Sequence, residues 1–302
     1  MNKTKVSVQA SPAKQLGVYA AKKKKLTIEQ KFAFVFLLAL ALIFIVPVIW
    51  VISSSFKDEH ELMRAGGFMW FPNTWTLDNF RIILSPANRA APVFRWFINS
   101  VVVSAIFTFF SVNITSMSAY AFSKLKFRGR DALFLTVLFV SSFPSIVTIV
   151  PLFHIMRIFG WLNTPWALVF PGLAGVFNIF LIKQFMIGIP DELLESAGID
   201  GAGDIRIFYQ IMLPLLKPIL AIIAIFSFTF IWNDFLWPSI AINDIDRLTL
   251  TAGLQLARGV FHNFPTRLSA TAVVAIVPMI VAYIIFEKWL VSGVSISAGI
   301  KG

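Results

Sequence analysis

Cysteine is absent from this sequence of 302 residues, and charged residues make up only 14% of it. Without cysteine there can be no disulfide framework, no thiolate zinc site and no thiol chemistry. The hydrophobic content is 58% and the mean hydropathy is +0.80, which are too high for a disordered or an ordinary soluble protein. Phenylalanine occurs 32 times, which argues against a nucleic-acid binder despite a net charge of +11. The composition therefore indicates an integral membrane protein whose basic residues lie outside the bilayer.

Sequence motifs for covalent chemistry are absent as well. No G-x-x-x-x-G-K-[ST] stretch occurs, so no cradle for nucleotide phosphates is predicted in this chain. No H-E-x-x-H occurs, and Asp234 is the only acidic residue inside a candidate membrane span. His154 has no Asp or second His at ligand spacing, so we predict no metal site. We expect that the chain is not an enzyme.

Charge-free stretches long enough to cross a bilayer define the candidate spans. A helix needs about 20 apolar residues to span a hydrocarbon core of roughly 30 Å. Five charge-free stretches meet this need, near 32–52, 97–121, 132–153, 162–182 and 268–286, and a sixth candidate near 219–240 is interrupted by Asn233-Asp234. The predicted fold class is therefore an all-α integral membrane protein with six transmembrane helices.

The distribution of Lys and Arg predicts the orientation of these spans. The N-terminal tail, residues 1–31, holds eight Lys, and with this tail inside, the inner segments carry 17 Lys and Arg against 9 outside. Basic residues favour the cytoplasmic side, so both termini are predicted to be cytoplasmic. The segments 53–95 and 241–267 then become large outer loops. We read the Lys run at 22–25 as an anchor to anionic lipid.

The inner segment 183–217 has a pattern of its own and holds five of the 15 acidic residues. Pro190 suits a first helical position, and the two acids after it favour the positive end of a helix. Gly201 suits the stop of this helix, and a second helix is predicted from Asp204 to Leu213-Pro214. These signals predict a helix–turn–helix beside the membrane with one apolar side, formed by Ile207, Phe208, Ile211 and Met212.

The same segment resembles the EAA loop of ABC importer permeases. The matching residues are Glu195-Ser196-Ala197, Asp200-Gly201-Ala202 and the ending Ile211-Met212-Leu213-Pro214, with Ser196 in place of the central Ala. Further stretches are similar to the carbohydrate-uptake branch, whose maltose-transporter-like permease has six spans. They are 75–80 (WTLDNF), 119–122 (AYAF), 232–238 (WNDFLWP) and 298–302 (AGIKG).

This resemblance implies a fold, a mechanism and partners. It implies a type I ABC importer permease domain over 32–302, in the cytoplasmic membrane of a bacterium or archaeon, that moves a sugar or oligosaccharide by alternating access. The first loop helix would be the coupling helix, with Glu195, Ser196, Ala197, Asp200, Gly201, Ala202, Leu213 and Pro214 at the ATPase contact. ATP-Mg would bind to a cytoplasmic ATPase dimer, and this chain would bind no cofactor. A second homologous permease, an extracytoplasmic solute-binding protein and membrane lipid complete the expected partners, with no nucleic acid.

Polar residues within the spans leave alternatives open. Six hydroxyl residues share one helical stripe of the second span, and they either pack helices closely or line the path: Ser100, Ser104, Thr108, Ser111, Thr115 and Ser118. Asn178 should face protein or the path. Trp232 and Trp237 suit an outer aromatic belt, whereas Asn233 and Asp234 suit a polar knot or a sugar contact. The candidate path residues are Ser104, Thr108, Ser111, Asn178, Trp232, Asn233 and Asp234.

A stand-alone secondary transporter or channel for a small polar solute is the alternative function. It predicts inverted internal repeats or several intramembrane charges. It gives no role to a cytoplasmic helix–turn–helix as long as 183–217.

Overall fold

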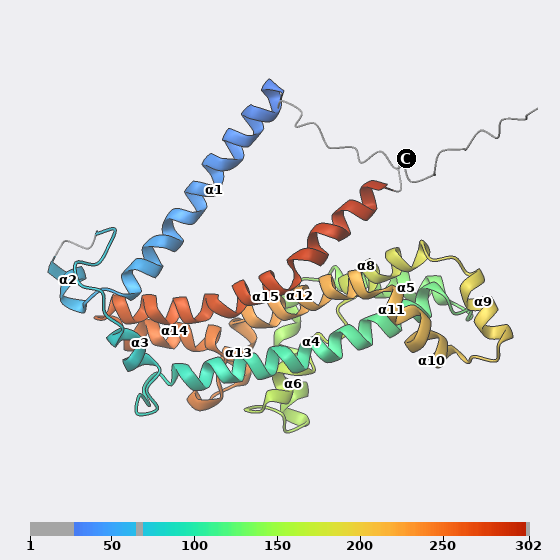
Figure 1. Ribbon diagram of the computed structural model, residues 1–302. Helices are drawn as coiled ribbons and strands as arrows, with labels where there is room; N and C mark the ends of the chain where they lie inside the picture. Colours follow the sequence, from blue (N-terminus) through green and yellow to red (C-terminus); the bar gives the residue numbers. More distant parts are fainter. Residues whose placement is uncertain (1–26, 65–68, 300–302) are drawn as a thin grey trace, which may run out of the picture. The chain divides into compact units, whose positions relative to one another are not determined.

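The computed structural model describes residues 27–64 and 69–299, with side chains from 27 to 61 and from 69 to 287. Every regular element in these ranges is helical (Figure 1). Most of the basic tail, including the Lys run at 22–25, and the last three residues lie outside the described residues. The chain divides into two compact units, residues 1–49 and 50–302, and the packing described below belongs to the second.

Three helices are long and apolar enough to cross a membrane without a break. They are α1 (Ile28–Ser55), α4 (Val93–Ser123) and the stretch Pro265–Glu287 of α15 (Pro265–Gly299). They contain the predicted spans 32–52, 97–121 and 268–286. Almost every residue of α1 from Ile28 to Ile49 is exposed in this chain, as expected for a helix that lipid surrounds.

The next two predicted spans are broken and are not straight helices. The stretch 132–153 corresponds to α5 (Arg130–Ser141), then η2 (Ser145–Thr148) and α6 (Ile149–Ile158), with a bend of 90°. Pro144 lies at the bend, where its ring disfavours helix in the residue before it. The stretch 162–182 splits into α7 (Pro165–Val169) and α8 (Val176–Ile187), and Pro171 and Gly172, with φ of +83°, lie between them. Counted with bent pairs, the described chain has up to five candidate spans, so the number six stays a prediction.

The fifth predicted span is α12 (Lys217–Asn233), followed by the short α13 (Leu236–Ala241). Asp234 interrupts the helix between them, and its carboxylate accepts a hydrogen bond from the backbone N–H of Trp237 at 3.3 Å. The segments 53–95 and 241–267 contain four further elements: α2 (Glu59–Arg64), α3 (Asp78–Ile83), η4 (Ile245–Arg247) and α14 (Leu250–Val260).

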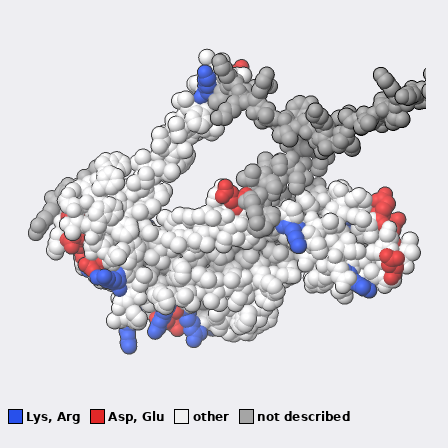
Figure 2. All heavy atoms as spheres, in the orientation of Figure 1, with Lys and Arg blue, Asp and Glu red and all other residues white. Residues whose placement is uncertain are grey.

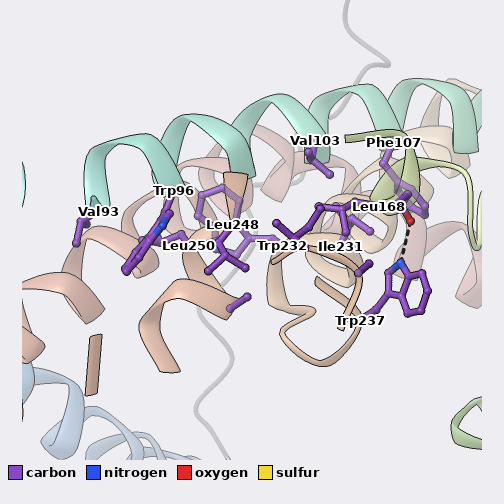
Figure 3. Close-up of a cluster of buried hydrophobic side chains, with 14 of the residues drawn as sticks. Val93, Trp96, Val103, Phe107, Leu168, Ile231, Trp232, Trp237, Leu248 and Leu250 are labelled. Carbon is purple, nitrogen blue, oxygen red and sulfur yellow. Dashed lines mark hydrogen bonds between the residues drawn. The ribbon is translucent and has the colours of Figure 1, made fainter. Parts of the chain in front are cut away.

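Helix α4 is the centre of the second unit. It packs against α8 and α12, and α12 in turn packs against α15. One buried cluster surrounds Trp96, Phe107 and Trp232 (Figure 3), and a second surrounds Met186, Met212 and Ile223. The first holds the segments 53–95 and 241–267 on α4, and the second holds the 183–217 loop on α4 and α8.

The aromatic-belt interpretation of Trp232 and Trp237 is wrong. Their side chains are buried, with relative exposures of 2% and 8%. The indole N–H of Trp232 donates to the carbonyl of Ala275 at 3.1 Å, and that of Trp237 donates to Ala167 at 2.8 Å (Figure 3). Both rings therefore fix helices to one another, because a buried indole needs a hydrogen-bond acceptor.

Candidate functional site

The segment 183–217 forms a helix–turn–helix at one end of α4 (Figure 1). Its first helix, α9, runs from Glu192 to Ile199. Pro190 therefore lies two residues before the helix and not at its first position. Figure 2 shows acidic side chains gathered over α9, and the five acids of the segment are all exposed: Asp191, Glu192, Glu195, Asp200 and Asp204.

The turn after α9 is set by Gly201, whose φ is +82°. The N–H of Ala202 donates to the carbonyl of Ala197 at 3.0 Å, and the N–H of Gly201 donates to Gly198 at 3.0 Å. These two bonds form a Schellman motif, in which a left-handed residue satisfies the last carbonyls of a helix. The predicted stop at Gly201 thus has a backbone cause.

The second arm is a single helical rod of three parts: α10 (Asp204–Ile207), the π-helical turn η3 (Phe208–Met212) and α11 (Leu213–Leu215). The helix does not end at Leu213-Pro214 as the sequence predicts. The wider π turn precedes Pro214, and the helix ends one residue after it, at Leu215. An 84° bend then leads into α12.

The apolar side of this arm is buried, whereas other positions of the helix–turn–helix carry exposed apolar residues. Ile207, Phe208 and Met212 pack in one cluster with residues of α8 and with Tyr120 of α4. Ile199 and Ile205 are exposed by 87% and 75%. Glu195 and Ser196 lie on the exposed part of α9, and Ala197 is turned inward with 9% exposure. The loop therefore presents a mixed acidic and apolar surface on a buried base.

An ion pair holds the loop to α4. The Lys124 ammonium donates to the Asp191 carboxylate at 2.5 Å and to the carbonyl of Ile189 at 2.6 Å. The hydrogen bond and the positive charge of Lys124 lower the pKa of Asp191 below its usual range. The Lys124 side chain is only 5% exposed, so the contact fixes where α9 begins relative to the end of α4.

The hydroxyl stripe of α4 faces its neighbouring helices. Ser104 and Ser111 are each 1% exposed. The Asn178 amide donates to Ser227 at 3.2 Å, and Ser227 donates to Ser111 at 3.3 Å, so a short polar chain links α8, α12 and α4. The hydroxyl of Thr108 is buried without a hydrogen-bond partner among the described residues. This placement favours the packing interpretation of the stripe within this chain.

Asn233 and Asp234 line an open cleft of about 610 Å³. Its other polar groups are Ser145, Thr148 and Thr229, and its apolar wall includes Phe230 and the break at Pro171-Gly172. Of the seven candidate path residues, only Asn233 and Asp234 line this cleft. A cleft with hydroxyl, amide and carboxylate groups beside an aromatic ring can bind a polyol.

Sequence reasoning missed two contributors to these sites. Lys124 was counted only as a topogenic charge, although it ties α4 to the loop. Thr229 was not considered, although it lies one turn before Asn233 in α12 and lines the same cleft. The spacing of four residues between them on a helix was the available signal.

Comparison with known proteins identifies relatives over most of the chain. A family model described as binding-protein-dependent transport system inner membrane component matches residues 111–296. The chain is 36% identical over 264 residues to the arabinooligosaccharides transport system permease protein AraQ of Halalkalibacterium halodurans, which covers 87% of this chain and 93% of that protein. It is 34% identical over 259 residues to the diacetylchitobiose uptake system permease protein NgcG of Streptomyces coelicolor, covering 84% of each chain.

Solved structures with the same fold come from alginate importers. A chain of a bacterial ABC transporter involved in the import of the acidic polysaccharide alginate matches with a TM-score of 0.75 and 22% identity, covering 88% of this chain and 99% of that one. A chain of a bacterial alginate ABC transporter, in complex with an alginate pentasaccharide-bound periplasmic protein, matches with a TM-score of 0.59 and 16% identity. It covers 87% of this chain and 94% of that one.

The family match, the identity to these permeases and the shared helical fold agree with one another. The chain belongs to the binding-protein-dependent transport system inner membrane component family, the permeases of ABC importers.

Proposed function

We propose that the chain is the permease subunit of an ATP-driven, binding-protein-dependent importer and forms half of the path for a sugar or oligosaccharide. The names of its relatives support a carbohydrate cargo, since they refer to arabinooligosaccharides and diacetylchitobiose. The alginate importer structures, one of them with a periplasmic protein bound, support the use of a solute-binding protein. ATP-Mg binds to a separate ATPase dimer.

The proposed arrangement places six spans in the cytoplasmic membrane of a bacterium or archaeon. The permease domain comprises residues 32–302, with a basic cytoplasmic tail over 1–31. The coupling loop 183–217 faces the cytoplasm, as do both termini, and the outer loops are 53–95 and 241–267. A second, homologous permease supplies the other half of the path. The excess of Lys and Arg on the predicted inner segments supports this orientation.

The observation that carries the proposal is the geometry of the coupling loop. Helix α9 ends in a Schellman turn, and the ion pair of Lys124 with Asp191 anchors its start. Its surface carries acidic and apolar side chains that are exposed in this chain. A stiff, anchored helix can pass a movement of an ATPase to the spans. A stand-alone transporter has no use for such a surface.

Co-purification tests this function. The complex extracted in detergent should contain a P-loop ATPase, and Glu195→Lys should weaken its association. Loss of a charge-assisted hydrogen bond of about 1.5–3 kcal/mol corresponds to a loss of about tenfold or more in affinity. Asp78→Lys, in the outer loop, is the matched charge reversal and should retain the ATPase. Absence of any ATPase from the unmodified complex would contradict the function.

We also propose that Asn233 and Asp234 touch the sugar, whereas Ser104, Thr108, Ser111, Asn178 and Trp232 hold the helices that shape the path. Asn233 and Asp234 line the cleft, whereas Ser104, Ser111 and Trp232 are buried and Thr108 and Asn178 are half-buried, and this contrast supports the division. Asp234→Asn should lower uptake without changing co-purification. Ser104→Ala should leave uptake kinetics unchanged. Normal uptake in Asp234→Asn together with reduced uptake in Ser104→Ala would overturn the division.

A further inference from the structure

An uncharged aromatic segment in the first outer loop has a fixed place at the end of α1. Residues 69–77 read Met-Trp-Phe-Pro-Asn-Thr-Trp-Thr-Leu. Three large rings and one leucine of this segment are exposed: Trp70 by 44%, Phe71 by 63%, Trp75 by 62% and Leu77 by 55%. Large exposed apolar side chains this close together on one loop suit an interaction site.

The backbone of the segment is held by polar groups from the last turn of α1, from the residues just after it and from α2. The Ser53 hydroxyl donates to the carbonyl of Trp70, and the buried Lys57 ammonium donates to the carbonyl of Met69. The N–H of Thr76 donates to the carbonyl of Phe56 at 2.9 Å. These contacts place both ends of the segment against residues 53–57.

A carboxylate holds the middle of the segment. Glu61 accepts hydrogen bonds from the N–H of Asn73 at 3.1 Å and of Thr74 at 3.0 Å. The ring of Trp75 also lies 5.6 Å from that of Phe56, centroid to centroid. With its backbone bound inward at five points, the segment holds its apolar side chains outward in a defined position.

The position of the segment identifies its partner. Helix α1 has 28 residues, about 42 Å at 1.5 Å per residue, and so exceeds a hydrocarbon core of roughly 30 Å. Its last turn therefore reaches the boundary between acyl chains and headgroups, and residues 69–77 lie beside that turn. Tryptophan favours this boundary, and Trp, Phe and Leu form the membrane-facing side of interfacial segments.

We propose that residues 69–77 form an interfacial anchor that rests in the headgroup region of the outer leaflet. The proposal rests on the transmembrane placement of α1 in the proposed function. It removes these aromatic residues from the surface offered to the solute-binding protein. The outer loops still offer charged groups to an aqueous protein partner, such as the ion pair of Arg95 and Asp246 at 2.6 Å.

Spin labels can measure the depth of the segment, because the chain has no native cysteine. The full chain is reconstituted with its partner subunits, freed of their own cysteines, in phosphatidylglycerol–phosphatidylethanolamine vesicles. Phe71→Cys carries the label, Arg89→Cys is the exposed outer-loop control, and Ile43→Cys marks the middle of α1. Collision rates are measured with oxygen, which concentrates in lipid, and with a nickel chelate, which stays in water.

The expected ratio of oxygen to nickel collisions at Phe71→Cys is several-fold above that at Arg89→Cys and below that at Ile43→Cys. A ratio equal to that of Arg89→Cys would overturn the anchor, since the segment would then face water. Low collision rates with both reagents would also overturn it, because a protein partner would then cover the segment. A water-like ratio at Ile43→Cys would instead contradict the span, and hence the proposed function.

Discussion

Two glycines show how a single residue can be required for different physical reasons. Gly201 is required for its backbone conformation, because its φ is +82° while an added Cβ would meet nothing within 4 Å. Gly253 is required for space, because an added Cβ would lie 2.3 Å from the ring of Trp96. The first was predictable from the sequence as a helix stop, and the second was not, since its neighbour lies far away in the chain.

Gly201→Val should disturb the turn between α9 and α10. A β-branched residue in a left-handed conformation costs about 1–2 kcal/mol, which the turn can relieve only by giving up its Schellman bonds. We expect loss of substrate-stimulated ATPase activity, measured on the reconstituted complex. Gly203→Ala is the control, because its φ of −76° suits alanine and its surroundings are open. Normal stimulation in Gly201→Val would show that the turn does not matter for coupling.

Gly253→Ala should destabilise the packing of α14 against α4. Trp96 is fully buried and its indole N–H donates to Ile245 at 2.6 Å, so the ring cannot move away without losing that bond. We expect a loss of about 3 kcal/mol, the upper part of the usual range for overpacking, seen as a lower midpoint of thermal unfolding. Gly259→Ala in the same helix meets nothing within 4 Å and should have little effect. Equal unfolding midpoints for the two variants would refute the close approach of Gly253 to the Trp96 ring.

At the scale of elements, local chemistry made much of the helix–turn–helix in 183–217 predictable. Its acids and Gly201 act on the residues next to them, so the first helix and the turn could be placed from the sequence, whereas the end of the second helix could not. The breaks at Pro144 and Pro171-Gly172 carried the same kind of signal, but their angles depend on the helices packed around them. The wide turn before Pro214 was missed because a π turn has no simple sequence pattern.

The contact between Lys124 and Asp191 should make the start of α9 sensitive to acid. Since the pKa of Asp191 is lowered in the folded chain, the contact is complete above the usual pKa of a carboxyl group. It is lost as the pH falls through the lowered value. A spin label at Ser196→Cys should therefore become more mobile over that acid range.

The same label in an Asp191→Asn background should show high mobility without this acid step. Asp200→Asn is the matched control, since this carboxylate belongs to the same loop but lies outside the Lys124 contact. It should keep the acid step of the unmodified chain. If the mobility of the label had the same pH profile in Asp191→Asn as in the chain without that substitution, the ion pair would be ruled out as the cause of the acid step.

At the scale of the whole molecule, polar contacts tie the segment 53–95 to α15. Arg267 pairs with Glu59 at 3.1 Å, with side-chain exposures of 21% and 19%. Nearby, the Thr266 hydroxyl donates to buried Asn79 at 3.0 Å, and Asn79 donates to the carbonyls of Ser55 and Lys57. No sequence pattern predicts such pairs, because they join residues about 200 positions apart and depend on the assembled fold.

Arg267→Met should leave Glu59 as an uncompensated, mostly buried carboxylate. The expected destabilisation is about 2 kcal/mol, between the values for exposed and fully buried pairs. Thermal unfolding of the purified complex measures it. The double variant Glu59→Gln with Arg267→Met should recover part of the loss, and exposed Arg258→Met should change little. If the destabilisation of the double variant equalled the sum of the destabilisations of the two single variants, the pair would carry no coupling energy.

The break between α7 and α8 has a consequence for how the protein is made. Helix α8 has 12 residues, about 18 Å in length, and cannot hold itself across a bilayer by its own hydrophobicity. During synthesis its exposed backbone ends at Gly175 and Gly188 must find partners before it can settle among the lipids. Helix α4, which precedes it in the chain and packs along it, supplies that surface. We therefore expect insertion of this fold to be ordered, with α8 retained in the membrane only after α4 is in place.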